Sequence, residues 1–329
     1  MVDLSTKYLG LNLINPIIIG SSGLTDTVEK IKKLEQKGAG AVVLKSIFEE
    51  EITLEYNQIL KEAEELGYHN ENLDYFDVKI KQQNIEKYLK LISDAKKAIS
   101  IPLIASINCI SSHEWTYIAK KIQNAGADAI ELNMYILPTS LESNNSEIEQ
   151  KYFEITKKVI AEITIPVSVK ISSYFTNLPY ITNKFAEIGV SGLVFFNKFY
   201  NIDIDVDNQN ITTANILSNP TENSSALRWI SMLSNKIKCD FAATTGIHDG
   251  KSVVKQILVG ASAVEMVSTF YKNGTNYIKV VLNEITEWME KNNYGSIKDF
   301  KGKMSQSKSS NPAIYERVQF MKYFANYQE

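Results

Sequence analysis

The chain has 329 residues, of which 44% are hydrophobic and 22% are charged, and this composition excludes a disordered, collagen-like or disulfide-stapled chain. Its 35 basic and 38 acidic residues give a net charge of −3, which does not support nucleic acid or an anionic membrane as the main partner. With two cysteines, no signal peptide and no apolar stretch of about 20 residues, we expect a protein of the reducing cytoplasm.

Eight short apolar segments follow one another along the chain, mostly separated by stretches with helical spacing. Apolar runs of this length are typical of strands buried on both faces of a parallel sheet. Eight such strands alternating with helices predict a (β/α)8 barrel. A doubly wound open sheet is the alternative, but the turn GSSGLTD after the first strand lacks the pattern G-x-G-x-x-G. In order, the segments are Ile17–Gly20, Gly38–Ser46, Leu103–Ile107, Gly126–Met134, Val167–Ile171, Gly189–Asn197, Asp240–Thr244 and Gly260–Ser268.

Four of these segments begin with a glycine that directly follows a helical stretch. Glycine suits the left-handed backbone position that ends a helix, so each of the four predicts a helix stop before a strand. Two other segments follow the dipeptide Ile-Pro, at Pro102 and Pro166, and proline is tolerated at the start of a strand. The four glycines are Gly38, Gly126, Gly189 and Gly260.

Two connections are much longer than the others, Ile47–Ser100 after the second strand and Phe199–Ser225 after the sixth. Long loops at the carboxyl end of a barrel are usually lids or binding loops. We assign residues 1–304 to the barrel and residues 305–329 to a helical extension that packs on the barrel or on a partner. The apolar spacing of the predicted extension helix rests on Ile314, Val318, Met321 and Phe324.

Polar residues gather where the eight predicted strands end, the edge that carries the active site in barrel enzymes. Lys45 and Lys170 interrupt apolar runs, so we do not expect them to be solvated surface charges. They meet either an anionic ligand or electron-rich ring, or, alternatively, a buried carboxylate such as Glu131. The other residues of this edge are Ser21, Ser22, Gly23, Ser46, Ser106, Asn108, Cys109, Asn133, Asn197, Lys198, Thr245, Gly246 and Ser268.

A phosphate site is predicted at the ends of the last two strands. Thr245-Gly246 and Ser268-Thr269 offer small residues and backbone N–H groups, and the helix starting in His248–Leu258 adds a favourable dipole. A zinc site is not expected, because His69, His113 and His248 lack metal-ligand spacing.

Taken together, these phrases resemble the dihydroorotate dehydrogenase family of FMN-dependent (β/α)8 barrels, class 1, and within it a divergent dihydroorotate-dehydrogenase-like branch. The resemblance rests on NPIIIGSSGL, AGAVVLKS, AGADAIELN, IPVSVKIS, TTGIHDG and GSIKDFKGKM. It implies oxidation of dihydroorotate to orotate in pyrimidine biosynthesis, a homodimer, and in one class 1 branch an iron–sulfur flavoprotein partner subunit.

The resemblance also implies which residues hold FMN. Ser21, Ser22 and Gly23 lie beside the flavin ring, and Lys170 faces the N1/O2 edge, where a positive charge favours hydride acceptance. The sequence departs from the family in the phosphate loop, with Thr and Val in place of two glycines. The remaining expected contacts are Lys45, Ser46, Asn108, Asn133, Thr245, Gly246, Val267 and Ser268.

The substrate side departs further. Ile136 stands where the family has the cysteine that removes a proton, and isoleucine cannot accept one. Asn133 and Asn197 remain as substrate-binding asparagines, and Lys45 and Lys198 supply positive charge. The predicted catalytic residues are Tyr135, Lys45 and Cys109, with Thr139 and Ser140 as further substitutes for the base. Tyr135 needs a strongly lowered pKa to serve as a base.

Three functions stay open at this point. The first is an FMN-dependent oxidoreductase that acts on dihydroorotate or on another small, planar, anionic substrate. The second is a flavin-binding electron relay without turnover of its own. The third is a phosphate-binding barrel without flavin.

Overall fold

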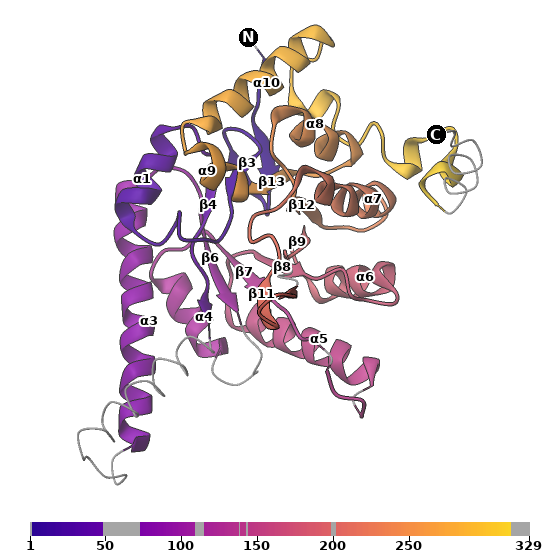
Figure 1. The fold of residues 1–329 in the computed structure, drawn as a ribbon. Helices are drawn as coiled ribbons and strands as arrows, with labels where there is room; N and C mark the ends of the chain where they lie inside the picture. The colour runs from indigo at the N-terminus through magenta and orange to yellow at the C-terminus, as the bar shows by residue number, and fades with distance from the viewer. Residues whose placement is uncertain are drawn as a thin grey trace.

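Eight parallel strands close into a barrel in the computed structural model, which describes residues 2–48, 73–108, 115–137, 139–142, 144–198 and 202–316 (Figure 1). The barrel closes because β13 pairs with β3 and β4 pairs with β6. The predicted (β/α)8 barrel is therefore confirmed. Its strands are β3 (Ile17–Ile19), β4 (Ala41–Val43), β6 (Leu103–Asn108), β7 (Ala129–Asn133), β8 (Val167–Ile171), β9 (Gly192–Phe195), β12 (Asp240–Thr244) and β13 (Ala263–Met266).

Helices surround the barrel and bury one face each against the strands (Figure 1). The four glycines predicted to end helices all adopt positive φ angles, from 100° at Gly38 to 121° at Gly260. The proline at 102 directly precedes β6 and that at 166 directly precedes β8, as predicted. The helices are α1 (Val28–Gln36), α3 (Leu73–Ala98), α4 (Trp115–Asn124), α5 (Asn145–Glu162), α6 (Leu178–Ile188), α7 (Asn223–Leu233), α8 (Gly250–Val259), α9 (Ser268–Asn273) and α10 (Tyr277–Lys291), with short turns η1 (Pro220–Glu222), η2 (Ile297–Asp299), η3 (Gln306–Lys308) and η4 (Pro312–Tyr315).

A hairpin that the sequence analysis did not predict closes the amino-terminal end of the barrel. It consists of β1 (Thr6–Tyr8) and β2 (Leu11–Leu13), and its tip residues Tyr8 and Leu9 are buried in the barrel interior. Small residues make room for them: a Cβ added to Gly192 would overlap Leu9 and lie 3.2 Å from the ring of Tyr8. The Leu9 N–H donates to Asp240 Oδ2 over 2.9 Å, which fixes the hairpin to β12.

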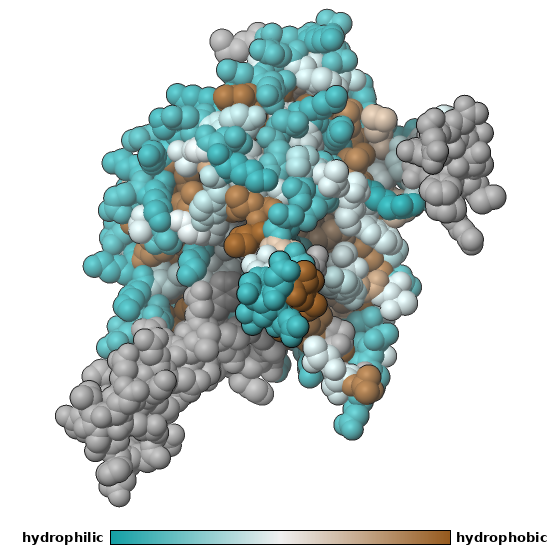
Figure 2. All heavy atoms as spheres, viewed as in Figure 1, coloured by the Kyte–Doolittle hydropathy of each residue, from teal (hydrophilic) through white to brown (hydrophobic). Residues whose placement is uncertain are grey.

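The long connection after β9 carries a second hairpin, of β10 (Ile202–Asp205) and β11 (Asn210–Thr213). Ile204 lies directly opposite Ile211, and these side chains are 60% and 78% exposed. Figure 2 shows apolar side chains on this protruding segment beside hydrophilic ones. The hairpin therefore presents an uncovered apolar face to solvent. Most of the other long connection lies outside the described residues, although β5 (Ile47–Phe48) opens it by pairing with β6.

The chain after residue 304 packs on α7 as far as it is described. Lys236 donates to Gln306 Oε1 over 2.5 Å, and Arg228 donates to the carbonyl of Tyr315 over 3.3 Å. Of the residues predicted to form the extension helix, Ile314 lies in the short turn η4, and the other three lie outside the described residues. No helix among the described residues is long and apolar enough to cross a membrane.

Candidate functional site

Two asparagines meet at the carboxyl edge of the barrel, as the sequence predicts. Asn133 is the last residue of β7, and Asn197 follows β9. Strand β8 lies between these two strands in the sheet. The Asn197 amide donates to Asn133 Oδ1 over 2.6 Å, and both residues are half-buried. The remaining amide N–H groups and carbonyl oxygen of the pair can still bind a polar, planar ligand at this edge.

Lys170 on β8 is buried, with 8% of its surface exposed. Its ammonium lies 2.7 Å from Glu265 Oε2 and 3.7 Å from Glu131 Oε1. The sequence analysis gave two readings for this lysine, and the ion pair with buried carboxylates is the one that the described residues realise. Lys170 nevertheless stays beside the asparagine pair, because it is the register partner of Asn133 in the sheet.

Burial and neighbouring charges act differently on Glu131 and on Lys170. Burial, and next the carboxylate of Glu265, raise the pKa of Glu131 well above its usual range. Burial favours the neutral amine of Lys170, but the carboxylates of Glu265 and Glu131 outweigh it and raise the pKa of the ammonium. Burial therefore favours the protonated form of Glu131, whereas the carboxylates keep Lys170 charged.

A chain of hydroxyl groups links three strands at the same edge. Ser21 Oγ lies 3.0 Å from Ser46 Oγ, and Ser46 Oγ lies 2.7 Å from Ser106 Oγ. Tyr88 on α3 closes the chain by accepting from the Ser106 N–H over 2.8 Å. The sequence analysis missed Tyr88, because an aromatic residue on an amphipathic helix gives no signal that distinguishes it from core. Ser22 and Gly23 follow in the half-buried turn after β3.

The two lysines predicted to bring positive charge to the substrate differ from expectation. Lys45 lies two residues after β4, and its side chain is exposed, so the prediction that it avoids solvent is wrong. Its neighbours Leu44 and Ser46 are buried, so the lysine points out of the wall that they form. Lys198 is paired with Glu222 over 2.8 Å, which balances its charge.

None of the described candidates for the base has the electrostatics of a base. Burial, and then the neighbouring Tyr174, raise the pKa of Tyr135, whereas a base needs it lowered. Ile136 packs against the hydrophobic core and donates its N–H to Tyr152 Oη over 2.8 Å. Thr139 and Ser140 are exposed, and Cys109 lies outside the described residues. Tyr135 is thus better suited to donate a proton than to accept one.

At the predicted phosphate site, the loop is present, and side chains already bind the first N–H groups of the following helix α8. Ser252 N–H donates to Asp249 Oδ1 over 2.6 Å, and Gly250 N–H donates to Glu284 Oε2 over 2.6 Å. Two carboxylates therefore already accept from N–H groups at the start of α8, and the contribution of this helix to a phosphate site stays a prediction.

Lys272 is a cation near this loop that the sequence analysis missed. Its ammonium donates to the Ser218 carbonyl over 2.8 Å, and the Ser218 N–H donates to Ser268 Oγ over 2.9 Å. Val267 and Ser268 lie at the junction of β13 and α9. Burial, and then Lys272, lower the pKa of His248, which keeps this histidine neutral. A lone lysine after a short strand gave no pattern by which to find it.

Thr245 adopts a left-handed conformation with φ of 68°, where the family has glycine. Its hydroxyl donates to the Phe196 carbonyl over 3.0 Å. Because any residue with a Cβ is strained in this conformation, we expect Thr245→Gly to raise the free energy of unfolding by about 1 kcal/mol, net of the lost hydrogen bond. Urea unfolding checks this. Thr245→Ala keeps the strain without the bond and is expected to be less stable than both; a stable alanine variant would contradict the argument.

The donor set of this edge fits a flavin. The buried Asn108 Oδ1 has no hydrogen-bond partner among the described residues, so it is free to accept from a ligand N–H. Amide, hydroxyl and ammonium donors lie at the same edge of the barrel, and these match the carbonyl and nitrogen edge of a flavin ring. Within the described ranges, no group of three His, Cys, Asp or Glu residues could hold a metal ion.

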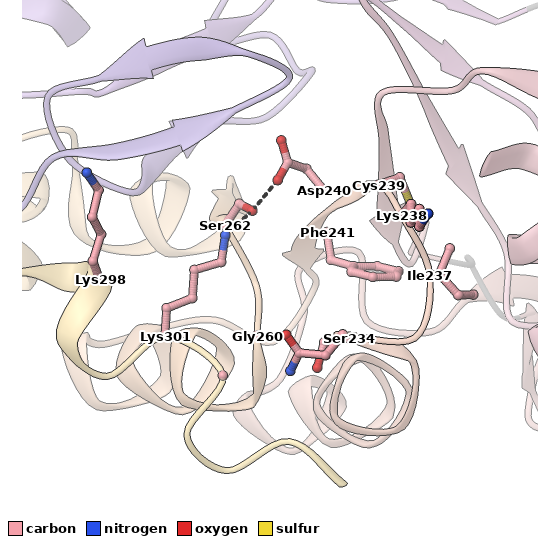
Figure 3. Close-up of a pocket in the computed structure, with 12 residues that line it drawn as sticks. Ser234, Ile237, Lys238, Cys239, Asp240, Phe241, Gly260, Ser262, Lys298 and Lys301 are labelled. Carbon is pink, nitrogen blue, oxygen red and sulfur yellow. Dashed lines mark hydrogen bonds between the residues drawn. The ribbon is translucent and has the colours of Figure 1, made fainter. Parts of the chain in front are cut away.

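A separate cavity of about 380 Å³ lies at the opposite, amino-terminal end of β12 and β13 (Figure 3). Its Lys301 donates to Ser262 Oγ over 2.6 Å, and Ser262 Oγ donates to Asp240 Oδ1 over 2.8 Å. None of the predicted site residues lines this cavity, and the hydrogen bonds of its polar groups join the amino-terminal ends of β12 and β13.

The comparisons with known proteins agree with the geometry. The model of the family described as dihydroorotate dehydrogenase matches residues 3–289. The catalytic subunit of dihydroorotate dehydrogenase B (NAD(+)) from Thermoplasma volcanium is 26% identical over 92% of this chain and 98% of its own length. The subunit of the same name from Methanocaldococcus jannaschii is 26% identical over 88% and 94%. Dihydroorotate dehydrogenase A (fumarate) from Lactococcus lactis is 26% identical over 92% and 99%.

Proposed function

Because this chain belongs to the dihydroorotate dehydrogenase family, whose enzymes use FMN to oxidise a carbon–carbon bond, we propose that it oxidises a small, planar, anionic substrate at the carboxyl edge of its barrel. Dihydroorotate, converted to orotate in pyrimidine biosynthesis, is the substrate that the family implies. The observation that carries the proposal is the Asn133–Asn197 amide pair beside the buried Lys170.

FMN, when bound, accepts the hydride that the substrate carbon gives up. The residues that would hold it are the turn Ser21–Gly23, Ser46, Asn108, Lys170, and the phosphate loop at Thr245-Gly246 and Val267-Ser268, with Lys45 at the rim. Ser21 and Ser46 fix each other through their hydroxyl contact, so the strand ends beneath the ring are held in place before the cofactor binds.

The asparagine pair orients the substrate through its remaining donors and acceptor. The proton that leaves with the hydride needs an acceptor other than Ile136. Tyr135 does not meet this need, since burial and then Tyr174 raise its pKa. Cys109, which follows Asn108 in the sequence and lies outside the described residues, is the remaining predicted candidate for the base.

We expect dihydroorotate to bleach the flavin band of the FMN-loaded protein under anaerobic conditions. Asn197→Ala is expected to weaken substrate binding by about 10- to 100-fold, because each lost hydrogen bond to a polar substrate is worth about 1–3 kcal/mol. Stopped-flow absorbance measures both. Dithionite is the control, since it shows that the flavin is reducible whatever the substrate.

If the band persists with dihydroorotate but bleaches with dithionite, the substrate assignment is wrong and the cofactor assignment stands. A protein that takes up no FMN contradicts both. A flavin that responds only to a protein partner favours the electron relay. The name "catalytic subunit" that two of the relatives carry implies a second subunit in those proteins.

A homodimer is the assembly that we propose, and the exposed apolar face of the β10–β11 hairpin supports it. Replacing both Ile204 and Ile211 with lysine is expected to convert dimer to monomer, because two charges then oppose their copies across the interface. Asp203→Asn is the control, since Asp203 points to the other face of the strand. Sedimentation velocity distinguishes the outcomes; a wild-type monomer, or a double variant that still dimerises, contradicts the proposal.

A further inference from the structure

Three ionisable side chains share the barrel interior beneath the asparagine pair. Glu131, Lys170 and Glu265 are 1%, 8% and 1% exposed. If all three were ionised, the cluster would carry a net charge of −1 in a buried site, which is strongly unfavourable. One proton must therefore be held by the two carboxylates. We propose that this cluster balances charge for bound FMN, by taking up a second proton when the cofactor is reduced; this rests on the proposed function.

The geometry links the cluster to both sides of the barrel. Lys170 on β8 reaches Glu265 on β13, although β9 and β12 lie between these strands in the sheet. The ion pair therefore crosses the interior. Glu131 Oε1 and Glu265 Oε1 accept no hydrogen bond from the described residues. Each carboxyl group thus has an oxygen available for a further proton.

Two tyrosines also face the cluster, and neither of them can supply a positive charge to balance the carboxylates. Tyr8 belongs to the β1–β2 hairpin at the amino-terminal end of the barrel. Burial, and then the charges of Glu265, Glu131 and Asp240, raise the pKa of its phenol. Burial likewise raises the pKa of Tyr88, with a further contribution from Glu131. Among the described residues, Lys170 is the cation that lies within 4 Å of either carboxylate. Protons are therefore the means by which the cluster changes its charge.

The charge balance of the reaction explains why the cluster would take up a second proton when FMN is reduced. Oxidation of the substrate carbon–carbon bond releases one hydride and one proton. The hydride brings two electrons and one proton to FMN, which gains one negative charge. That charge and the ionised carboxylate then compete for the single ammonium of Lys170. A second proton on the two carboxyl groups removes the competition, and the proton that the substrate releases supplies it through solvent.

The test is the midpoint potential of FMN in the loaded protein as a function of pH. Glu265→Gln frees the lysine charge, so reduced FMN is expected to bind at least tenfold more tightly relative to oxidised FMN, about 30 mV for a two-electron couple. The same variant should lose the proton uptake coupled to reduction. Glu131→Gln should retain that uptake, because glutamine replaces a carboxyl group that is already neutral.

A surface pair provides the matched control. Lys184 and Glu187 also lie 2.7 Å apart, but both are well exposed, so Glu187→Gln should change neither potential nor pH slope. If Glu265→Gln does not fold, an infrared difference spectrum of the wild type decides: reduction should add a carboxylic-acid band, which persists in Glu131→Gln. If all variants bind FMN with the same midpoint potential and the same pH slope, or if reduction adds no carboxylic-acid band, this inference is overturned and the proposed function stands. Failure to bind FMN overturns the proposed function instead.

Discussion

Lys170→Met is expected to lower the free energy of unfolding by about 3–5 kcal/mol, because it leaves a buried carboxylate without its cation. Lys170 is the partner of Glu265 at 2.7 Å, and the glutamate side chain is fully buried. Methionine is similar in length and apolar, so the loss reports the charge and not a cavity. Urea unfolding followed by circular dichroism measures the change.

The double variant Lys170→Met/Glu265→Gln is expected to recover most of that loss, since it removes both members of the ion pair. A double variant as unstable as the single one would show that packing around Lys170, and not charge, holds this part of the barrel. FMN affinity should stay weakened in both variants, because both lack the ammonium that the ring edge would contact.

The loss should also depend on pH in a defined direction. The pKa of Glu131 is raised in the folded protein, and Lys170 is one of the groups that limits this rise. Without the lysine the folded pKa rises further. A carboxyl group with a raised folded pKa stabilises the fold below its unfolded pKa, about 4.3, and this contribution is lost as pH rises through the folded value. The deficit of Lys170→Met should therefore be smallest in acid and grow toward neutral pH.

Gly246→Ala is expected to destabilise the protein by about 2–5 kcal/mol, as the sum of left-handed strain and overpacking. Gly246 has φ of 79°. An added Cβ would overlap the main-chain nitrogen of Asn223 and lie 2.8 Å from the Glu222 carbonyl carbon, so backbone must move. Since Glu222 holds Lys198, the displacement should also disturb the substrate side.

Gly189→Ala separates the two contributions. Gly189 has a similar φ of 103°, but a Cβ there would meet nothing within 4 Å. This variant should lose only about 1–2 kcal/mol from the backbone conformation. Thermal unfolding of the two variants side by side gives the steric contribution as the difference. Equal losses would mean that the segment beside Gly246 adapts without cost.

The barrel could be predicted from the sequence because its signals are local. A glycine that ends a helix and the apolar run after it lie within ten residues of each other, and Gly126 with β7 is one such case. The hairpin β1–β2 could not be predicted in this way. Its place depends on Leu9 reaching Asp240, a contact between residues far apart in sequence.

The site was predictable in its residue types but not in its pairings. The position of Asn133 and Asn197 at strand ends follows from the strand pattern, and the structure brings them together. The partner of Lys170 does not follow from any pattern, because Glu265 lies within an apolar run that reads as ordinary core. Lys45 shows the converse: it also interrupts an apolar run, yet its side chain is exposed between the buried residues Leu44 and Ser46.

The plug at the amino-terminal end of the barrel sets an order of events during synthesis. Thr6 donates to the carbonyl of Ser262, 256 residues later, and Leu9 donates to Asp240, 231 residues later. These first residues leave the ribosome long before their partners exist. The nascent chain must therefore carry Tyr8 and Leu9 uncovered until nearly the whole barrel has been translated, a period in which chaperones are its natural protection.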